Sequence, residues 1–356
     1  MDVLHSMMAP ATEEPTEEDL EEERRGHPRE LKSYLIESNG KLQPQFADEK
    51  FKGSIDPTGL DDIKILHLST GNRTANFFLD MGTDRFWVLH TNDLAENAFP
   101  LVKRFVRFPE FQLDQAWIPA QLLESITKKP SNRFEGFGLE YEDKFALDEE
   151  ERAPIEELTV NVSGANAPEA LEQLRSGPAL QRAISYNKVR IERGEKGRSA
   201  TDDITLWGAF NVKGGASIDD HISLIQSTSS QYAQVVKEVE SHRLTTKGEQ
   251  DTLSLEGQAF SLVFERRIDN LDLFVNRLFS SEEPFRLWGI KSQARDGYCQ
   301  VNAIDLHTGH PLDLEITRGL IRVYLPDQTC GNSLLRLYVN LQHYFDARVE
   351  CAEISV

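Results

Sequence analysis

Residues 311–345, PLDLEITRGLIRVYLPDQTCGNSLLRLYVNLQHYF, contain two apolar periodicities in succession. Before Pro326, on either side of a turn at Arg318-Gly319, every second residue is apolar, which is the period of a strand with one buried face. From Leu334 onward the apolar residues recur every three or four positions, which is the period of an amphipathic helix. The segment therefore predicts two paired strands and a helix that packs on them.

The same patterns extend towards the N-terminus of this segment. Alternation at 260–264 and 298–306, together with an extended stretch at 285–289, predicts three more strands. An apolar stripe over 271–278 predicts a helix capped by Asp269 or Asn270. Asn332 or Ser333 is the expected cap of the final helix. The order over 255–356 is therefore β-α-β4-α. An antiparallel sheet with both helices on one face would bury every stripe, which predicts the α+β class.

Residues 155–247 show a related order. Strands are expected near 158–162, 186–193 and 204–212, a helix after Asn166, and a long helix from Ser217 to about Val239. Polar residues at 195–203 and 245–254 predict a loop and a linker. This recurrence predicts a tandem duplication of a β-α-β(n)-α module. The order is similar to that of the TATA-binding-protein-like fold, a resemblance of topology alone.

The N-terminal part has a different composition. Residues 1–29 form an acidic, low-complexity arm that we expect to be disordered. Residues 30–150 predict an α+β domain, with strands at 31–37, 63–68, 74–81 and 86–90 and a helix capped by Asn92 or Asp93. An acidic stretch at 147–156 marks the expected boundary with the next module.

Composition limits the class of protein. The 356 residues carry a net charge of −20, which opposes non-specific attraction to DNA or anionic lipid. Apolar runs are too short for a membrane span, the N-terminus lacks a secretory pattern, and the three cysteines lack a CxxC spacing. We expect a soluble, cytoplasmic protein with free thiols.

Acidic and histidine side chains crowd one predicted hairpin. His307, His310, Asp313 and Glu315 are residue types that ligate divalent cations, and strand parity allows some of them to face one another. A divalent metal is the single cofactor that the sequence suggests. The alternative is a solvated sheet face on which Arg322 pairs with Asp313 or Glu315 across strands.

Two further patterns suggest other chemistry. One predicted strand and the loop after it carry a run of basic residues that could contact phosphates. The run comprises Lys188, Arg190, Arg193, Lys196 and Arg198. Glu142 and Lys144 on a strand, with Asp114 upstream, fit part of a metal-dependent nuclease motif, but alternation alone also explains an outward Glu and Lys.

Trp207 is the strongest interaction signal in the sequence. Strand parity places its ring away from the core, where it would contact a partner or another module. No catalytic set converges, so the leading hypothesis is a non-enzymatic interaction or regulatory protein that binds a protein partner through its sheet faces. The alternatives are a metal-dependent hydrolase or nuclease and a nucleic-acid-binding protein.

Overall fold

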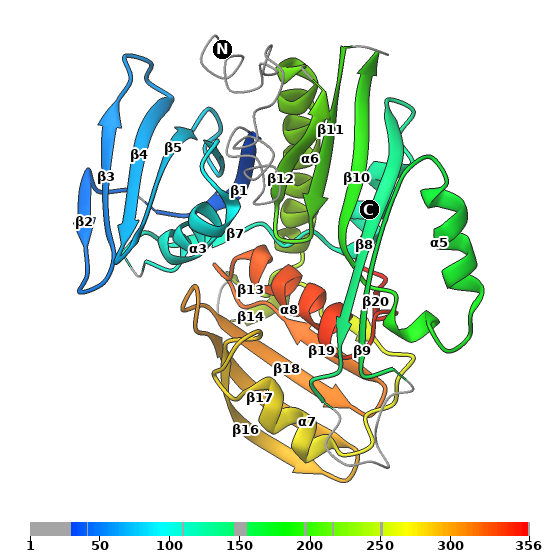
Figure 1. Cartoon of the computed structure of the whole chain (residues 1–356). Coiled ribbons are helices and arrows are strands. Elements are labelled where there is room, and N and C mark those ends of the chain that lie inside the picture. The colour runs from blue at the N-terminus through cyan, green and yellow to red at the C-terminus, as the bar shows by residue number, and fades with distance from the viewer. Residues whose placement is uncertain are drawn as a thin grey trace. The chain divides into compact units, whose positions relative to one another are not determined.

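The computed structural model describes residues 30–40, 42–108, 110–145, 155–195, 198–215, 217–249 and 252–354. The predicted arm at 1–29 lies outside these residues. The chain forms two compact units. The first unit comprises residues 1–116, 126–134 and 189–230, and the second comprises 117–125, 135–188 and 231–356. Both combine helices with antiparallel strands, which confirms the α+β class (Figure 1).

The first unit is built on one antiparallel sheet. Its strands follow the order β2-β3-β4-β5-β6-β1-β12-β11, and β7 also pairs with β1. Their bounds are β1 Lys32–Ser38, β2 Gln45–Ala47, β3 Lys52–Pro57, β4 Ile63–Thr70, β5 Arg73–Asp80, β6 Phe86–Thr91, β7 Leu113–Gln115, β11 Arg198–Thr205 and β12 Ala209–Gly215. All seven residues of β1 are buried, so both faces of this central strand are covered.

Helix α3 (Ala95–Val106) packs on this sheet and contributes five of the twenty buried residues of its main core cluster. The aromatic core around it consists of Phe46, Phe51, Phe105, Phe108 and Phe111. The predicted cap at Asn92 or Asp93 is wrong, because Leu94 occupies the N-cap. The carboxylate of Asp93 instead accepts the backbone N–H of Asn76 on β5 at 2.7 Å.

Three other local predictions need correction. The expected single strand at 204–212 is a hairpin, in which β11 ends at Thr205 and β12 begins at Ala209. The expected loop at 195–203 largely belongs to β11. The expected linker at 245–254 contains β13 (Thr245–Glu249) and β14 (Thr252–Glu256), which pair with each other. The hairpin was missed because apolar residues continue through its turn at 206–208, and the other strands were missed because they are rich in polar residues.

The second unit contains several separate segments. Its elements include β9 (Glu157–Ser163), α5 (Ala167–Ser176) and η1 (Gln181–Ala183), and β9 pairs with β8. Four elements contribute residues to both units because the chain passes from one unit to the other within them. They are α4 Ala120–Thr127, β8 Asn132–Glu142, β10 Tyr186–Glu195 and α6 Ile218–Ser241. Asp220 N–H donates to Ser217 Oγ at 3.3 Å, as the predicted cap of α6 requires.

The C-terminal segment has the predicted β-α-β4-α order, followed by one short strand. Its six-stranded antiparallel sheet has the order β16-β17-β18-β19-β15-β20. The bounds are β15 Phe260–Val263, α7 Leu271–Leu278, β16 Leu287–Arg295, β17 Tyr298–Asp305, β18 Pro311–Thr317, β19 Leu320–Tyr324, α8 Gly331–Tyr344 and β20 Glu350–Cys351. Asn270 caps α7 as expected, since its side chain accepts the N–H of Leu273 at 3.2 Å.

Helices α7 and α8 both pack on one face of this sheet (Figure 1). Phe279, at the end of α7, lies against Gly289 of β16, and Ser333 of α8 bonds to Asp305 of β17. Gly289 and Asp305 belong to the same sheet face by strand parity. The prediction of helices on one face is confirmed. The tandem duplication is not confirmed, because the middle strands are divided between the two units.

Helix α8 begins at a different residue from the one expected. Its N-cap is Cys330 rather than Asn332 or Ser333. Side chains from distant segments satisfy the first amides, since Cys330 N–H donates to His310 Nδ1 at 3.3 Å and Gly331 N–H donates to the Glu240 carboxylate at 3.0 Å. Every residue from Gly331 to His343 is buried, so α8 is covered on its polar side as well as its apolar side.

Candidate functional site

The face of the C-terminal sheet opposite α7 and α8 carries exposed apolar side chains. Trp288 is 44% exposed, Ile290 58%, and Ile304 and Leu306 40% each. Trp288 lies opposite Ile304, and Ile304 lies opposite the exposed Pro311, so these residues continue across three strands. We call the set Trp288, Ile290, Ile304, Leu306 and Pro311 the apolar strip. Contiguous exposed apolar surface of this kind marks interaction sites more often than isolated apolar residues do.

Strand β16 is the last strand of the sheet in the described residues, and its edge is blunted. The pairing with β17 shifts register between Lys291 and Gln293, which is a bulge. Lys291 also forms an ion pair with Asp272 of α7 at 3.0 Å. Bulges and lysines at an edge disfavour the addition of another strand. The sheet face is therefore the accessible feature, rather than the edge.

Polar side chains continue this face beyond the apolar strip. Asn302 Nδ2 donates to Asp313 Oδ1 at 2.6 Å, and Arg322 lies 3.6 Å from the Glu315 carboxylate on the neighbouring strand. The cross-strand pair is thus the one that the solvated-face alternative predicted. Asp313 and Glu315 lie on this face, on the same strand.

His307 and His310 lie on the turn between β17 and β18 and bond elsewhere. His307 Nδ1 is 3.1 Å from the Arg286 guanidinium, and His310 Nδ1 accepts the N–H of Cys330. Burial lowers the pKa of His310, which favours its neutral form. Within the described ranges, no three His, Cys, Asp or Glu side chains are close enough to hold a metal ion. The four predicted ligands are not brought together, and metal binding stays a prediction.

The Asp305 carboxylate stabilises the turn between β17 and β18. It is fully buried at the end of β17, where it accepts the His307 N–H at 2.8 Å and the Ser333 hydroxyl at 2.7 Å. It also forms a buried ion pair with Arg336 of α8. Burial alone would raise the pKa of Asp305, but the Arg336 charge and these hydrogen bonds lower it to about 2. The carboxylate is ionised and holds the sheet, the turn and α8 in one arrangement.

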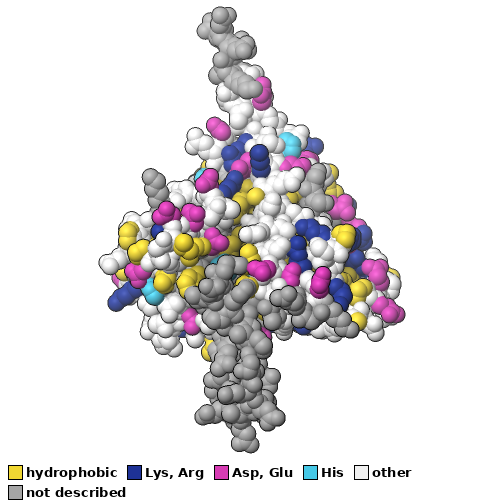
Figure 2. Space-filling view, turned by 90° about the horizontal axis from the view of Figure 1, so that it is seen from above, with side chains coloured by type: hydrophobic (Ala, Val, Ile, Leu, Met, Phe, Trp, Pro, Cys, Tyr) yellow, Lys and Arg dark blue, Asp and Glu magenta, His cyan; other side chains and the backbone are white. Residues whose placement is uncertain are grey.

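The predicted basic run is not assembled into one free surface. Arg190 donates to both carboxylate oxygens of Asp203, at 2.6 and 2.9 Å, and Arg193 donates to Ser227 Oγ at 3.2 Å. Lys188 belongs to the second unit, Lys196 lies outside the described residues, and only the backbone of Arg198 is described. On the face that Figure 2 displays, basic and acidic side chains are interspersed. Nucleic-acid binding stays a prediction.

Trp207 lies against the interior of the first unit. It occupies the turn between β11 and β12, so the parity of a continuous strand does not apply to it. Its ring packs 5.8 Å from that of Phe99, beside the core cluster of the first unit. Strand parity predicted an interaction role for Trp207 and none for Trp288. The missed signal is that residues 298–306 carry apolar side chains on both strand faces, since Ile304 and Leu306 have the opposite parity to Val301 and Ala303.

A buried polar chain in the first unit resembles a nucleophile–base–acid set. Ser33 Oγ lies 2.9 Å from His221 Nε2, and His221 Nδ1 lies 2.7 Å from the Asp202 carboxylate. Ser33 Oγ is also 2.8 Å from His90 Nδ1. Burial lowers the pKa of His90 to about 3, so His90 is neutral. Ser33, His221 and Asp202 have no exposed surface, and a substrate would reach Oγ only if this unit opened. These hydrogen bonds link β1, β6, β11 and α6.

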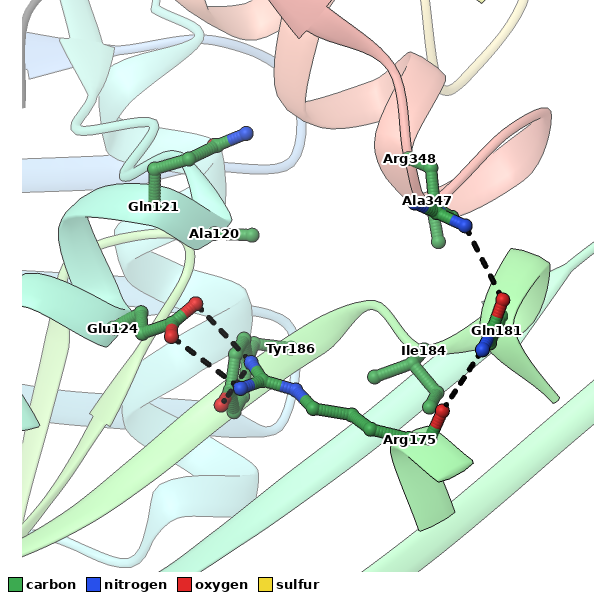
Figure 3. Close-up of a pocket in the computed structure, with 9 residues that line it drawn as sticks. All are labelled: Ala120, Gln121, Glu124, Arg175, Gln181, Ile184, Tyr186, Ala347 and Arg348. Atoms are coloured by element: carbon green, nitrogen blue, oxygen red, sulfur yellow. Dashed lines mark hydrogen bonds and ion pairs between the residues drawn. The ribbon is translucent and has the colours of Figure 1, made fainter. Parts of the chain in front are cut away.

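A cavity of about 330 Å³ in the second unit has a polar lining (Figure 3). Arg175 crosses it and donates to the Glu124 carboxylate at 3.1 and 3.4 Å and to the Tyr186 hydroxyl at 3.1 Å. On the opposite side, Arg348 donates to Gln181 at 3.3 Å. Burial raises the pKa of Tyr186 to about 12. Because the Arg175 and Glu124 charges satisfy each other, these two side chains offer a ligand little net charge.

The fold and these surfaces define an α+β protein with one open, partly apolar sheet face. No helix in the described part of the chain is long and apolar enough to cross a membrane. The chain belongs to the MJECL33-like protein family, which it matches over residues 2–355. It is 27% identical over 357 residues to the uncharacterized protein MJECL33 of Methanocaldococcus jannaschii, in an alignment that covers 89% of this chain and 85% of that protein.

Proposed function

We propose that this protein is a non-enzymatic interaction component that binds another protein on the exposed face of β16, β17 and β18. The apolar strip is the observation that carries this proposal. Its four large apolar side chains, Trp288, Ile290, Ile304 and Leu306, lie at neighbouring positions of a sheet whose other face is covered by α7 and α8. A rigid, preorganised surface loses little conformational entropy when a partner binds.

The size of the strip fits a binding site. From the exposed fractions, the strip offers on the order of 350 Å² of apolar surface, which matches the largest patches that monomers expose. Covering it would contribute roughly 9 kcal/mol before the costs of association are subtracted. Tryptophan is one of the residue types most enriched among the side chains that dominate the binding energy of interfaces. We therefore assign Trp288 as the central anchor.

The test is affinity capture with a strip variant and a matched control. Trp288→Ser with Ile304→Ser removes the anchor pair from the exposed face and leaves the buried face intact. Val263→Ser, on β15 of the same sheet, removes an apolar side chain that is 47% exposed outside the strip. We expect the strip variant to recover its partner at least about tenfold less in quantitative mass spectrometry, while Val263→Ser retains it. Equal recovery by all three proteins, with unchanged thermal unfolding, would contradict the proposal.

A further inference from the structure

The residues beside the apolar strip indicate the charge of its partner. Asp313 lies on β18 two residues from Pro311, which pairs with Ile304, so it is a diagonal neighbour of the strip. Diagonal neighbours across antiparallel strands are about 7–8 Å apart, a distance that a Lys or Arg side chain spans. The Asp313 carboxylate accepts the Asn302 amide, and no described cation pairs with it. Glu315, one step further, already has Arg322.

A second copy of this chain is a poor occupant. Two strips facing each other would bury roughly 700 Å² of apolar surface, about the apolar share of an interface at the lower limit of the standard size. Each copy also brings a net charge of −20, and like charges of that size repel at moderate ionic strength. A different chain with positive charge suits both features of the site.

We infer that the occupant is a short amphipathic segment of another protein, with an apolar stripe flanked by Lys or Arg. This inference rests on the proposed function and specifies its partner. Neighbouring strands lie about 4.8 Å apart, close to the 5–6 Å between side chains three or four positions apart on a helix. Apolar side chains one turn apart can therefore contact Trp288 and Ile304, while a flanking Lys or Arg reaches Asp313.

The probes are two synthetic helical peptides with the same leucine stripe, one flanked by lysines and the other by glutamates. The full-length protein is titrated with each peptide by calorimetry. We expect the Leu/Lys peptide to bind and the Leu/Glu peptide to show no binding. Trp288→Ser with Ile304→Ser should weaken the Leu/Lys peptide at least about tenfold. Asp313→Asn should weaken it about threefold and reduce the dependence of binding on salt.

The matched control for Asp313 is Asp296→Asn. Asp296 is 99% exposed and lies outside the strip, so this variant removes the same formal charge elsewhere. It should bind the Leu/Lys peptide as the wild type does. Equal loss in both aspartate variants, or unchanged binding by the strip variant, would show attraction to net charge alone and overturn the inference.

A second outcome separates this inference from the proposed function. If capture recovers a partner whose binding depends on Trp288 and Ile304 but whose contacting segment lacks basic residues, the inference fails and the proposed function stands. If the strip substitutions affect neither capture nor the peptide, both fail. Because the strip variant keeps the formal charge of −20, each result is independent of the charge of the whole chain.

Discussion

At the scale of single residues, Asp305 makes a pH prediction whose sign can be worked out. Its pKa is about 2 in the folded protein and near 3.8 when unperturbed. Because the folded value is the lower one, the stabilisation is complete above pH 5 and is lost as the pH falls towards 2. The shift corresponds to roughly 2 kcal/mol. Between pH 5 and pH 2, the free energy of unfolding should therefore decrease more for the wild type than for Asp305→Asn. The expected difference between the two decreases is roughly 2 kcal/mol.

Urea unfolding of both proteins across this pH range measures the difference. Asp305→Asn should already be less stable at pH 5, because it leaves the Arg336 charge buried without its partner. Asp296→Asn is the control, since its carboxylate is exposed. Parallel pH profiles for the wild type and Asp305→Asn would show that the buried ion pair does not stabilise the fold in this way.

Residue-level pairings were the least predictable part of the structure. The partners of Asp305 on α8 lie 28 or more residues away, and His221 lies 188 residues from Ser33. No local pattern indicates that such residues meet. The predicted metal ligands were all taken from one hairpin, because parity is the only relation that a single strand reveals. The Glu315–Arg322 pair was predictable for the same reason, since it depends only on register between neighbouring strands.

At the scale of elements, periodicity predicted the C-terminal strands and helices well. Its success with the caps was divided. Asn270 and Ser217 accept amides of their own helices as predicted, whereas Asp93, Asn332 and Ser333 bond to distant segments. It also missed the strip, since an apolar residue on the second face of a strand is indistinguishable by sequence from one covered by another layer. Alternation defines the two faces of a sheet and leaves open which of them the rest of the chain covers.

Gly214 and Gly215, the last two residues of β12, give an element-scale prediction. Gly215 has φ of +87°, and a Cβ there would overlap the Ser199 carbonyl oxygen. Gly214 has open space around its Cβ position. We expect Gly215→Ala to destabilise the protein by more than about 2 kcal/mol and Gly214→Ala to change stability by less than about 0.5 kcal/mol.

Urea unfolding of the two variants provides the measurement, and each is the other's control because they differ by one position. Backbone conformation and close approach to β11 are sufficient to require glycine at 215. A Gly215→Ala variant as stable as Gly214→Ala would remove this explanation.

At the scale of the whole molecule, each compact unit draws on three separate segments of the chain. Composition suggested boundaries at the acidic and polar stretches, which give the predicted domains 30–150, 155–247 and 255–356. Periodicity along the chain does not show which distant segments share a core. The long helix α6 illustrates this, since its regular apolar stripe continues through the position where the two units divide.

The most direct whole-molecule prediction concerns the range 255–356. Its helix α8 is buried on the side away from the sheet by other segments of the second unit. Gln121 donates to the Tyr338 hydroxyl at 2.7 Å, and the Gln342 side chain accepts the Ala120 N–H at 3.2 Å. Tyr141 donates to the Phe345 carbonyl at 2.8 Å. Excision exposes this whole side of α8 and removes its apolar contacts.

We therefore expect the isolated 255–356 fragment to retain secondary structure in far-ultraviolet circular dichroism but to lack a cooperative urea transition. The full-length chain is the reference. In hydrogen exchange, its amides in residues 255–356 should open together in one cooperative unfolding event. A fragment with a sigmoidal transition and native-like amide protection would mean that the sheet, α7 and one side of α8 form a sufficient core. The contacts of α8 with residues 120–141 would then position the exposed sheet face without stabilising it.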